Sequence, residues 1–326
     1  MVELTVSALA ALRAIDAGPI SQGLSSENAS ACLHQAIRPL NATSLQSAIA
    51  VAGLEPRSIA IIVPEGVFTT PIEWTAIAAA AGCTVHLKAP QSEPGLCRIM
   101  SELFTQAGLP VTWSTERQLP HVDAILAVGG DDTVDAISQH HPHIPVVKYG
   151  HPFSIALVTD NAEQATVPVA IECSRYDGRG CMAPTAVFTT LDPRELIEAM
   201  VPVMTLMEQK YPRGLVDHAL GPEWRRCIGL ARILGRVKIG AEWAITAYPR
   251  DYFTPSALPR MVTIHPIKDL DEMRETLRPY QPWLSTLGTD KPDANVPGIH
   301  RICRLGWMQA PSIPSNHDGR PMLSGL

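Results

Sequence analysis

The chain has 326 residues, 46% of them hydrophobic and 18% charged, which is enough apolar material for two modest domains or one large one. Its net charge of −6 argues against a nucleic-acid-binding protein. The N-terminus carries Glu3 and lacks the basic start of a signal peptide, and no apolar run is long enough to span a bilayer. We therefore expect a cytoplasmic protein without a membrane span.

The seven cysteines are scattered, and none forms a CxxC pair. This pattern predicts reduced thiols rather than a disulfide framework or a structural zinc site. The neighbouring His140, His141 and His143 lie in a proline-broken loop without supporting cysteines or paired carboxylates. We therefore expect no metal ion.

The first half of the chain alternates short apolar runs with helical segments. Residues 1–55 are predicted to be helical. Strands are then predicted at 58–66, 83–90, 109–113, 122–130 and 144–150, and helices at 71–83, 94–108 and 131–140. Alternation of this kind predicts right-handed crossovers and a buried parallel sheet, as in a nucleotide-binding fold.

A second α/β region is predicted after Gly150. Its expected strands are 153–158, 167–173, 185–190 and 260–267, and its expected helices are 193–211 and 269–280. From Asp290 onward the chain is rich in proline and glycine, which indicates an ordered loop or terminal arm. We expect one domain over 1–149 and another over 150–303, with the arm at about 304–326 returning to the first domain.

The segment YDGRGCMAP (176–184) is the strongest candidate for covalent chemistry. Gly178 and Gly180 flank Arg179 and lead into Cys181. Glycines allow a tight turn whose backbone N–H groups could lower the thiol pKa and hold an oxyanion, and Arg179 could add positive potential. The alternative is an inert cysteine in a turn.

Two further motifs lie where parallel strands end. In AVGGDDTVDAI, Gly129, Gly130 and Asp131 connect a strand to a helix, which suits a nucleotide-binding turn or simply a capped helix. In VHLKAPQ, Lys88 lies at the end of a strand, where ligands of open α/β sheets bind. A solvated loop lysine is the alternative.

Taken together and in order, the motifs resemble the aldehyde dehydrogenase superfamily. The closest branch is the acyl-CoA reductase family, which includes the fatty acid reductase of bacterial luminescence. The resemblance covers residues 55–190 well and 255–326 more loosely. It rests on IAIIVPEGVFTTP (59–71), AAAAGCTVHLKAPQSEP (78–94), AILAVGGDDTVDAI (124–137), VVKYGHPFSIALV (146–158), RYDGRGCMAPTAVF (175–188) and RLGWMQAPSIPSNHDGRPML (304–323).

The resemblance implies an aldehyde dehydrogenase-like α/β fold, with a Rossmann-type cofactor domain and an α/β catalytic domain whose nucleophile is Cys181. It also implies a nicotinamide cofactor. Lys88 matches the lysine that contacts the adenosine ribose, and Gln91 replaces a glutamate found in many NAD-preferring members. Because this change removes repulsion against a 2′-phosphate, NADPH is expected, with NADH as the alternative. The other cofactor-binding residues expected from the resemblance are Pro64, Gly129, Gly130 and Asp131.

Two departures from the superfamily pattern bear on the reaction. The loop PEGVF (64–68) lacks the asparagine that donates to the oxyanion, and KYGHP (148–152) lacks the glutamate general base. Without that base, release of an acid by water is disfavoured, whereas reduction of a thioester remains open. His151 is a candidate acid or base, with a structural role as the alternative. Gly180 and Arg179 are expected at the oxyanion turn.

The sequence thus predicts NAD(P)H-dependent reduction of an acyl thioester to an aldehyde. The expected substrate is an acyl-CoA or an acyl-carrier protein, with an acyltransferase or synthetase as a candidate partner. Two alternatives stay open, namely oxidation of a free aldehyde and a non-catalytic subunit of an acyl-transfer complex. The acyl chain length is not specified by the sequence, and a homo-oligomer stays open.

Overall fold

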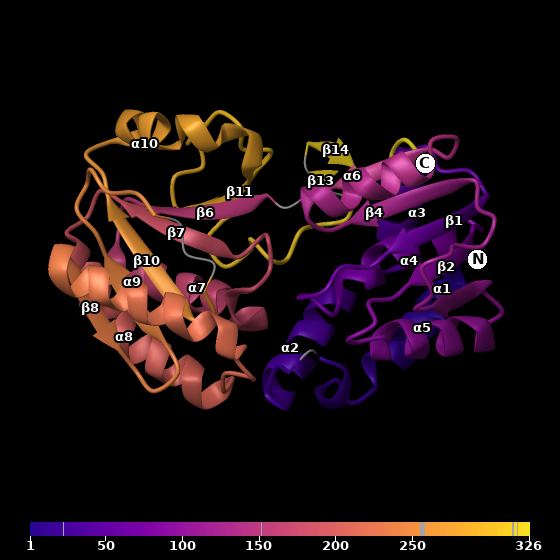
Figure 1. Ribbon diagram of the computed structural model, residues 1–326, viewed down its shortest axis with the longest axis horizontal. Helices are drawn as coiled ribbons and strands as arrows, with labels where there is room; N and C mark the ends of the chain where they lie inside the picture. The colour runs from indigo at the N-terminus through magenta and orange to yellow at the C-terminus, as the bar shows by residue number, and fades with distance from the viewer. Residues whose placement is uncertain (22, 151, 255–257, 315, 318) are drawn as a thin grey trace. The chain divides into compact units, whose positions relative to one another are not determined.

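The computed structural model describes residues 1–21, 23–150, 152–254, 258–314, 316–317 and 319–326. The chain divides into two compact units (Figure 1). The first unit comprises Met1–Gln22, Ala29–His151 and Pro311–Leu326, and the second comprises Gly23–Asn28 and Pro152–Ala310. Each unit is built around its own sheet, as the predicted α/β fold requires.

The sheet of the first unit consists of five parallel strands in the order β3-β2-β1-β4-β5. The strands are β1 (Ser58–Ile62), β2 (Thr84–Lys88), β3 (Val111–Ser114), β4 (Ala124–Val128) and β5 (Val146–Tyr149). The chain builds outward from β1 in one direction and then from β4 in the other. The loops after β1 and β4 therefore diverge at the carboxyl edge of the sheet, which is where open α/β sheets bind ligands.

Helices flank this sheet. They are α1 (Val2–Arg13), α3 (Ala42–Ala52), α4 (Thr70–Ala80), α5 (Gly95–Gln106) and α6 (Asp131–His140). Helix α2 (Ser26–Ile37) begins in the segment Gly23–Asn28, which belongs to the second unit. The alanine-rich α4 is buried over nearly its whole length, because it lies between β1 and β2 on one side and α1 and α3 on the other. This explains why its sequence is apolar on all faces. Helix α6 packs Val134 against Ala60 and Ile125 of the sheet.

The second unit holds seven strands in the order β12-β11-β6-β7-β10-β9-β8. They are β6 (Phe153–Val158), β7 (Pro184–Thr189), β8 (Arg236–Ile239), β9 (Ala244–Ala247), β10 (Met261–Pro266), β11 (Leu284–Thr289) and β12 (Arg301–Arg304). All neighbours pair in parallel except β8, which is antiparallel to β9 and forms one edge of the sheet. A two-stranded hairpin of β13 (Asn316–His317) and β14 (Arg320–Pro321) lies in the terminal arm.

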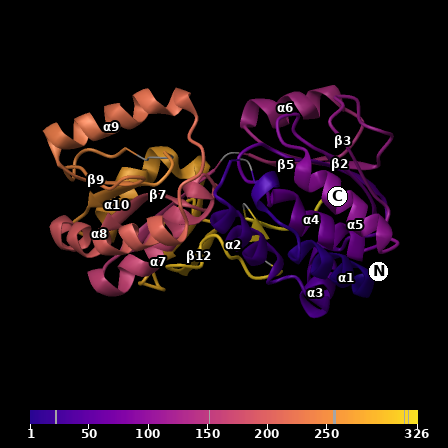
Figure 2. The ribbon, with the colours of Figure 1, turned by 90° about the horizontal axis from the view of Figure 1, so that it is seen from below.

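Helices cover both faces of the second sheet. They are α7 (Ala162–Ser174), α8 (Pro193–Lys210), α9 (Gly221–Leu234) and α10 (Leu270–Leu277). Figure 2 shows α7 and α8 on one side of the sheet and α9 on the other. The side chains alternate accordingly, since Ile245 and Val262 pack in the cluster with α7 and α8, whereas Ala244 and Met261 pack against α9.

The predicted strand at 167–173 is wrong, because these residues belong to helix α7. The alternating Val167, Val169 and Ile171 suggested a strand. Asn161 instead caps a helix by accepting a hydrogen bond from the backbone N–H of Gln164 (3.0 Å). The buried residues recur at helical spacing, and tertiary burial of that face outweighs the strand preference of the β-branched residues. Helix α9 and strands β8, β9, β11, β12, β13 and β14 were not predicted from the sequence.

Candidate active site

The cysteine motif forms a turn with an unusual backbone. After α7, the short helical turn η2 (Arg175–Gly178) contains Tyr176, Asp177 and Gly178 at φ values of 50°, 55° and 74°. Such values cost about 1–2 kcal/mol for a non-glycine residue. A Cβ at Gly178 would lie 3.1 Å from the carbonyl oxygen of Cys173. Both the positive φ and this close approach therefore favour glycine at position 178. The turn reverses the chain and delivers Cys181 to the start of β7.

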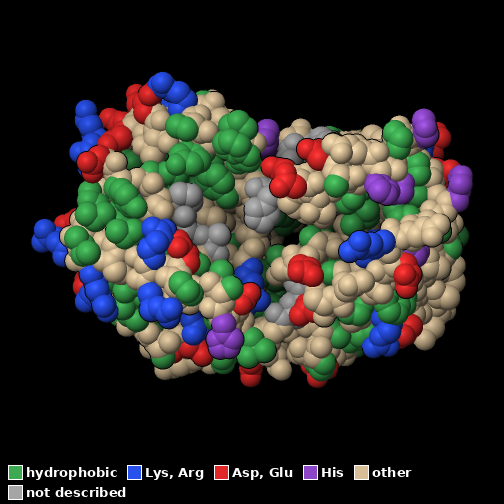
Figure 3. Space-filling view, viewed as in Figure 1, with side chains coloured by type: hydrophobic (Ala, Val, Ile, Leu, Met, Phe, Trp, Pro, Cys, Tyr) green, Lys and Arg blue, Asp and Glu red, His purple; other side chains and the backbone are tan. Residues whose placement is uncertain are grey.

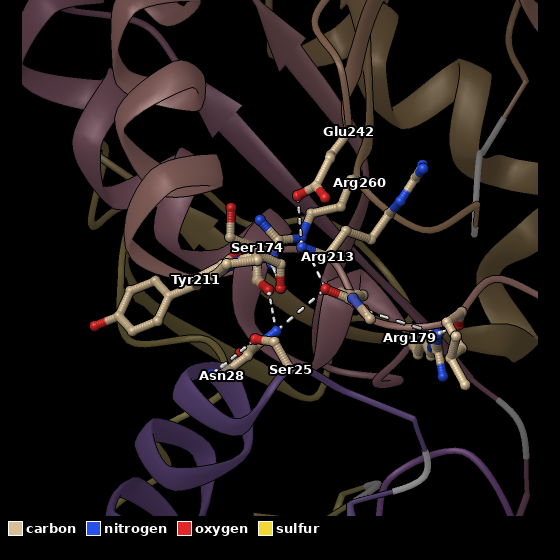
Figure 4. A network of polar contacts seen from close by, with 12 residues as sticks. Ser25, Asn28, Ser174, Arg179, Tyr211, Arg213, Glu242 and Arg260 are labelled. Atoms are coloured by element: carbon tan, nitrogen blue, oxygen red, sulfur yellow. Dashed lines mark hydrogen bonds and ion pairs between the residues drawn. The ribbon is translucent and has the colours of Figure 1, made fainter. Parts of the chain in front are cut away.

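A network of polar contacts that includes Asn28, Arg179 and Arg260 stabilises this backbone (Figure 4). The Asp177 carboxylate is fully buried and accepts hydrogen bonds from Arg260 Nε (2.8 Å), Asn28 Nδ2 (3.1 Å) and the backbone N–H of Gly214 (3.0 Å). Arg260 is itself only 1% exposed and donates its backbone N–H to the Asp177 carbonyl. Because the two opposite charges are paired and hydrogen-bonded, their burial is tolerated, but removing either one would leave the other uncompensated.

Arg179 connects the turn to the loop that precedes α9. Its Nη2 donates to the Leu215 carbonyl (2.6 Å) and lies 3.7 Å from the Asp177 carboxylate. The guanidinium is about one-fifth exposed. The structure therefore gives Arg179 a role in joining two loops, in addition to the positive potential expected from the sequence.

The backbone of Cys181 is held by strand β6. The fully buried Ser154 hydroxyl donates to the Cys181 carbonyl (2.8 Å) and accepts from the backbone N–H of Thr286 (3.2 Å). The pairing of β6 with β7 is irregular at Ser154 and Ile155. Irregularities of this kind re-aim side chains next to active sites. The turn closes where the Ala183 N–H donates to the Gly180 carbonyl (2.9 Å).

Arg301 of β12 contacts the same region from the other side. Its Nε donates to the Thr286 hydroxyl (3.3 Å), and its Nη2 contacts the Met182 sulfur (3.6 Å). Nη1 and Nη2 also donate to the carbonyls of Trp307 and Met308. Arg301 thus contacts Met182, the neighbour of Cys181 in the chain, and Thr286, whose backbone N–H donates to Ser154.

The carboxylate of Glu172 binds the same segment as Arg301. It accepts hydrogen bonds from the backbone N–H groups of Met308 (2.7 Å) and Gln309 (3.2 Å). Burial raises the pKa of Glu172 above its usual range. These two peptide units therefore lie between a cation and a carboxylate. A charged residue on a helix face that is otherwise apolar is the one sequence signal that could have identified Glu172.

Cys181 and Cys303 are half-buried, whereas the other five cysteines are buried. Burial raises the pKa of Cys97 and Cys173 to about 12, and that of Cys303 to about 11, which keeps these thiols protonated. Cys181 is half-buried and lies in the glycine turn at the end of η2. A half-buried cysteine in a glycine turn is suited to nucleophilic attack.

The residues expected to bind a cofactor lie at the carboxyl edge of the first unit's sheet. Pro64 follows β1, Lys88 ends β2, and Gly129 and Gly130 follow β4. Strand register aligns them, since Ile62 pairs with both Lys88 and Ala127. The structure thus brings together residues that are far apart in the sequence. Gln91 is exposed in the loop after β2.

The loop geometry at this edge fits a dinucleotide. Gly130 is the N-cap of α6, and a Cβ placed there would meet no atom within 4 Å. The backbone at the start of α6 is therefore open to a ligand, and a helix start favours an anion. Asp131 and Asp132 oppose this preference in part. The Asp131 carboxylate lies so close to Gly150 that a Cβ there would be 2.4 Å away.

Lys88 and the loops after β1 and β2 complete the edge. Lys88 Nζ donates to the Ala89 carbonyl (2.8 Å), and partial burial lowers its pKa below the usual range. Ser92 donates to the Glu65 carboxylate (2.6 Å), which joins the two loops. This edge of the sheet thus provides the Lys88 cation, the open backbone at Gly130 and a reversal of strand order. Together these features fit a nicotinamide dinucleotide.

His151 lies outside the described residues, so its predicted acid–base role stays a prediction. In the part of the chain that the structure describes, no group of three or more His, Cys, Asp or Glu side chains is arranged to hold a metal ion. No described helix has both the length and the apolar character that crossing a membrane requires.

Comparison with known families and sequences gives a consistent picture. The family model described as Acyl-CoA reductase (LuxC) matches residues 112–326. A long-chain acyl-protein thioester reductase of Vibrio harveyi is 26% identical over 230 residues, which are 65% of this chain and 47% of the relative. A second such reductase, from Photobacterium leiognathi, is 24% identical over 217 residues, or 61% of this chain and 45% of the relative. The chain thus spans about half the length of the curated relatives that it matches.

Solved structures show the fold. The substrate-bound AldH of Staphylococcus aureus superimposes with a TM-score of 0.71 at 14% identity, covering 100% of this chain and 84% of the other. An oxidoreductase from Marinobacter aquaeolei gives 0.74 at 12% identity, covering 99% and 82%. These similarities extend over both units and confirm the predicted aldehyde dehydrogenase-like fold.

Proposed function

The chain belongs to the acyl-CoA reductase (LuxC) family, and from this premise we propose that it reduces an acyl thioester to an aldehyde at Cys181. The proposal rests chiefly on the Cys181 turn. There the half-buried Cys181 follows a glycine, and its backbone carbonyl accepts a hydrogen bond from the Ser154 hydroxyl. Overall, a thioester, reduced nicotinamide dinucleotide and a proton give an aldehyde, oxidised dinucleotide and a free thiol.

Attack by Cys181 forms the first covalent bond. The sulfur of Cys181, as thiolate, adds to the thioester carbonyl carbon. Backbone N–H groups of the turn, including that of Cys181, stabilise the oxyanion, because the fixed left-handed residues and the Ser154 hydrogen bond hold this backbone in place. The oxyanion then collapses, the carbon–sulfur bond to the donor breaks, and the donor leaves as a thiol that takes up a proton.

The second half of the reaction needs a hydride, which the reduced nicotinamide supplies when bound. Lys88, Gly129 and Gly130 would hold the dinucleotide in the first unit. Cys181 keeps the acyl group in place during reduction and leaves as thiolate when the aldehyde forms. Because the glutamate base of ordinary aldehyde dehydrogenases is missing from KYGHP (148–152), release of an acid by water stays slow. His151 is the candidate proton donor.

The finer specificity follows from the same residues. NADPH is preferred because Gln91 places no carboxylate near the 2′-phosphate, with NADH as the weaker donor. The first unit, with the arm from Pro311, binds the cofactor, and the second unit carries the nucleophile. The acyl group comes from coenzyme A or from a protein, since the relatives named above are acyl-protein thioester reductases.

The test is an aldehyde-forming assay of the purified chain. NADPH and a panel of acyl-CoA and acyl-carrier-protein thioesters are supplied, and trapped aldehyde is identified by mass spectrometry. Wild type should form aldehyde, and Cys181→Ala should form none while binding NADPH with unchanged affinity. Cys303→Ala is the matched control, and it should retain turnover. Aldehyde from Cys181→Ala would remove Cys181 as the nucleophile.

A further inference from the structure

Helix α9 and strand β8 carry an excess of positive charge in an otherwise acidic chain. Residues 210–239 contain seven Lys and Arg residues against two Asp and Glu residues, whereas the whole chain has a net charge of −6. Figure 3 shows Lys and Arg side chains gathered over the part of the second unit that contains these elements. A concentration of one charge sign in an oppositely charged chain creates a local field that attracts a ligand of the other sign.

Most of this positive charge is not paired with an acidic side chain of the described residues. Arg226 is paired with Glu223, and Lys238 lies 3.0 Å from Glu198. Arg225, Arg232 and Arg236 are exposed, and none of the three forms an ion pair with another described residue. Three cations are therefore available to a partner.

Exposed apolar side chains accompany these cations. Ile233 and Leu215 are 81% and 80% exposed, the highest values among the large hydrophobic residues that the structure describes. Leu234 and Ile239 are 43% and 45% exposed. A surface that combines apolar side chains with unpaired charges is typical of a protein-binding site rather than of an ordinary solvated face.

Gly229 provides an independent observation. It lies in the middle of α9, where glycine is less favourable than alanine, and a Cβ there would meet no atom within 4 Å. Packing within the chain therefore does not require glycine. Gly229 is four residues after Arg225 and three before Arg232, so all three share one face of the helix. A glycine between two arginines allows the backbone of another molecule to approach closely.

We propose that Arg225, Gly229, Arg232, Ile233 and Arg236 form a docking surface for an acidic helix of the protein that carries the acyl thioester. The inference rests on the proposed function, because it identifies the acyl donor of that reaction as a protein. Helix α9 begins after the loop whose Leu215 carbonyl binds Arg179, two residues from Cys181. The chain thus connects the docking surface to the loop that contacts the Cys181 turn.

Charge argues against a second copy of this chain as the occupant. In a two-fold symmetric interface the same patch meets itself, which would place arginine against arginine. An acidic helix instead pairs with the three arginines, covers Ile233, and fits against the glycine as closely packed helices do.

The experiment compares two donors of one acyl group, palmitoyl-CoA and an acyl carrier protein loaded with palmitate. The triple variant Arg225→Glu, Arg232→Glu, Arg236→Glu should lower kcat/KM for the protein donor at least 10-fold and change that for palmitoyl-CoA less than 2-fold. Added salt should weaken the wild type's use of the protein donor. The matched control, Arg194→Glu, Lys268→Glu, Arg278→Glu, makes the same charge change elsewhere on the second unit and should leave both donors unaffected.

Gly229 is tested separately. Gly229→Ala should raise the melting temperature, which shows that the helix tolerates a side chain, and Gly229→Leu should weaken use of the protein donor about 5-fold or more with palmitoyl-CoA unchanged. Binding of the carrier protein, measured by fluorescence anisotropy without turnover, keeps this question distinct from the proposed function. Equal loss with both donors, unchanged binding by the triple variant, or binding only to phosphatidylglycerol vesicles would overturn the proposal.

Discussion

The two regions that the proposed reaction needs are built in different ways. The proposed cofactor edge is a property of topology, because Lys88, Gly129 and Gly130 lie at the ends of parallel strands and reach one edge whatever their side chains contact. The Cys181 turn depends instead on specific buried contacts. Asp177 pairs with Arg260, and Ser154 binds the carbonyl of the nucleophile itself.

This difference predicts different responses to substitution. Damage to the turn should reduce both stability and catalysis, because buried partners such as Arg260 hold its left-handed residues. Damage to the edge should change cofactor binding and leave stability nearly unchanged, because the strands are set by the hydrophobic core. The substitutions that follow test this contrast, beginning with the largest expected effect.

Asp177→Asn should destabilise the protein most. It leaves the buried guanidinium of Arg260 without a counter-charge, and breaking such pairs lowers the free energy of unfolding by about 3–5 kcal/mol. Urea unfolding followed by circular dichroism measures the change. The exposed Asp251→Asn is the control and should stay within about 0.5 kcal/mol of wild type. Equal effects of the two would show that the buried pair does not support the turn.

Ser154→Ala should reduce both catalysis and stability. It removes the donor to the Cys181 carbonyl and the acceptor of the Thr286 N–H, with a loss of about 1–3 kcal/mol in unfolding free energy and roughly a 10-fold lower kcat. Thr185→Val is the matched control, because it removes a hydrogen bond to the Ser154 carbonyl (3.2 Å) without affecting that of Cys181. An equal reduction of kcat in Thr185→Val would argue against the idea that Ser154 positions Cys181.

Gly150→Ala should affect the cofactor edge alone. The new Cβ would displace the Asp131 carboxylate, which moves the start of α6 and raises the dissociation constant of NADPH about 10-fold, or ~1.4 kcal/mol. Titration of cofactor fluorescence measures this constant. Acylation of Cys181 without cofactor should proceed at the wild-type rate, and slower acylation would show that the two regions are not independent.

Gln91→Glu should have the smallest effect. The new carboxylate repels a 2′-phosphate by ~1 kcal/mol at an exposed position, which corresponds to about a 5-fold shift of kcat/KM from NADPH toward NADH. The ratio of kcat/KM values for the two cofactors is the readout. An unchanged ratio would place Gln91 outside the cofactor site.

The same contrast explains what could be predicted from the sequence. Strand and helix periodicity located Pro64, Lys88, Gly129 and Gly130 at strand ends, and parallel topology then brought them together. The supports of Cys181 could not be predicted in this way. Arg260 is 83 residues from Asp177, and Arg301 is 119 residues from Met182, so no local pattern connects them.

Helix α7 illustrates the limit of local patterns within one segment. The alternating β-branched residues at 167–171 predicted a strand, whereas the cap at Asn161 and the burial of Ala165, Val169 and Cys173 give a helix. Glu172 is a polar residue on that buried face, and its partners at 308 and 309 became apparent only from the fold.

The most direct test of Cys181 as the nucleophile is mass spectrometry of the intact chain and its peptides after incubation with palmitoyl-CoA and no cofactor. A palmitoyl adduct should appear on the peptide that contains Cys181, and adding NADPH should remove it as palmitaldehyde forms. Cys181→Ala should carry no adduct on that peptide. An adduct on another cysteine that NADPH discharges to aldehyde, with Cys181 unmodified, would contradict the account.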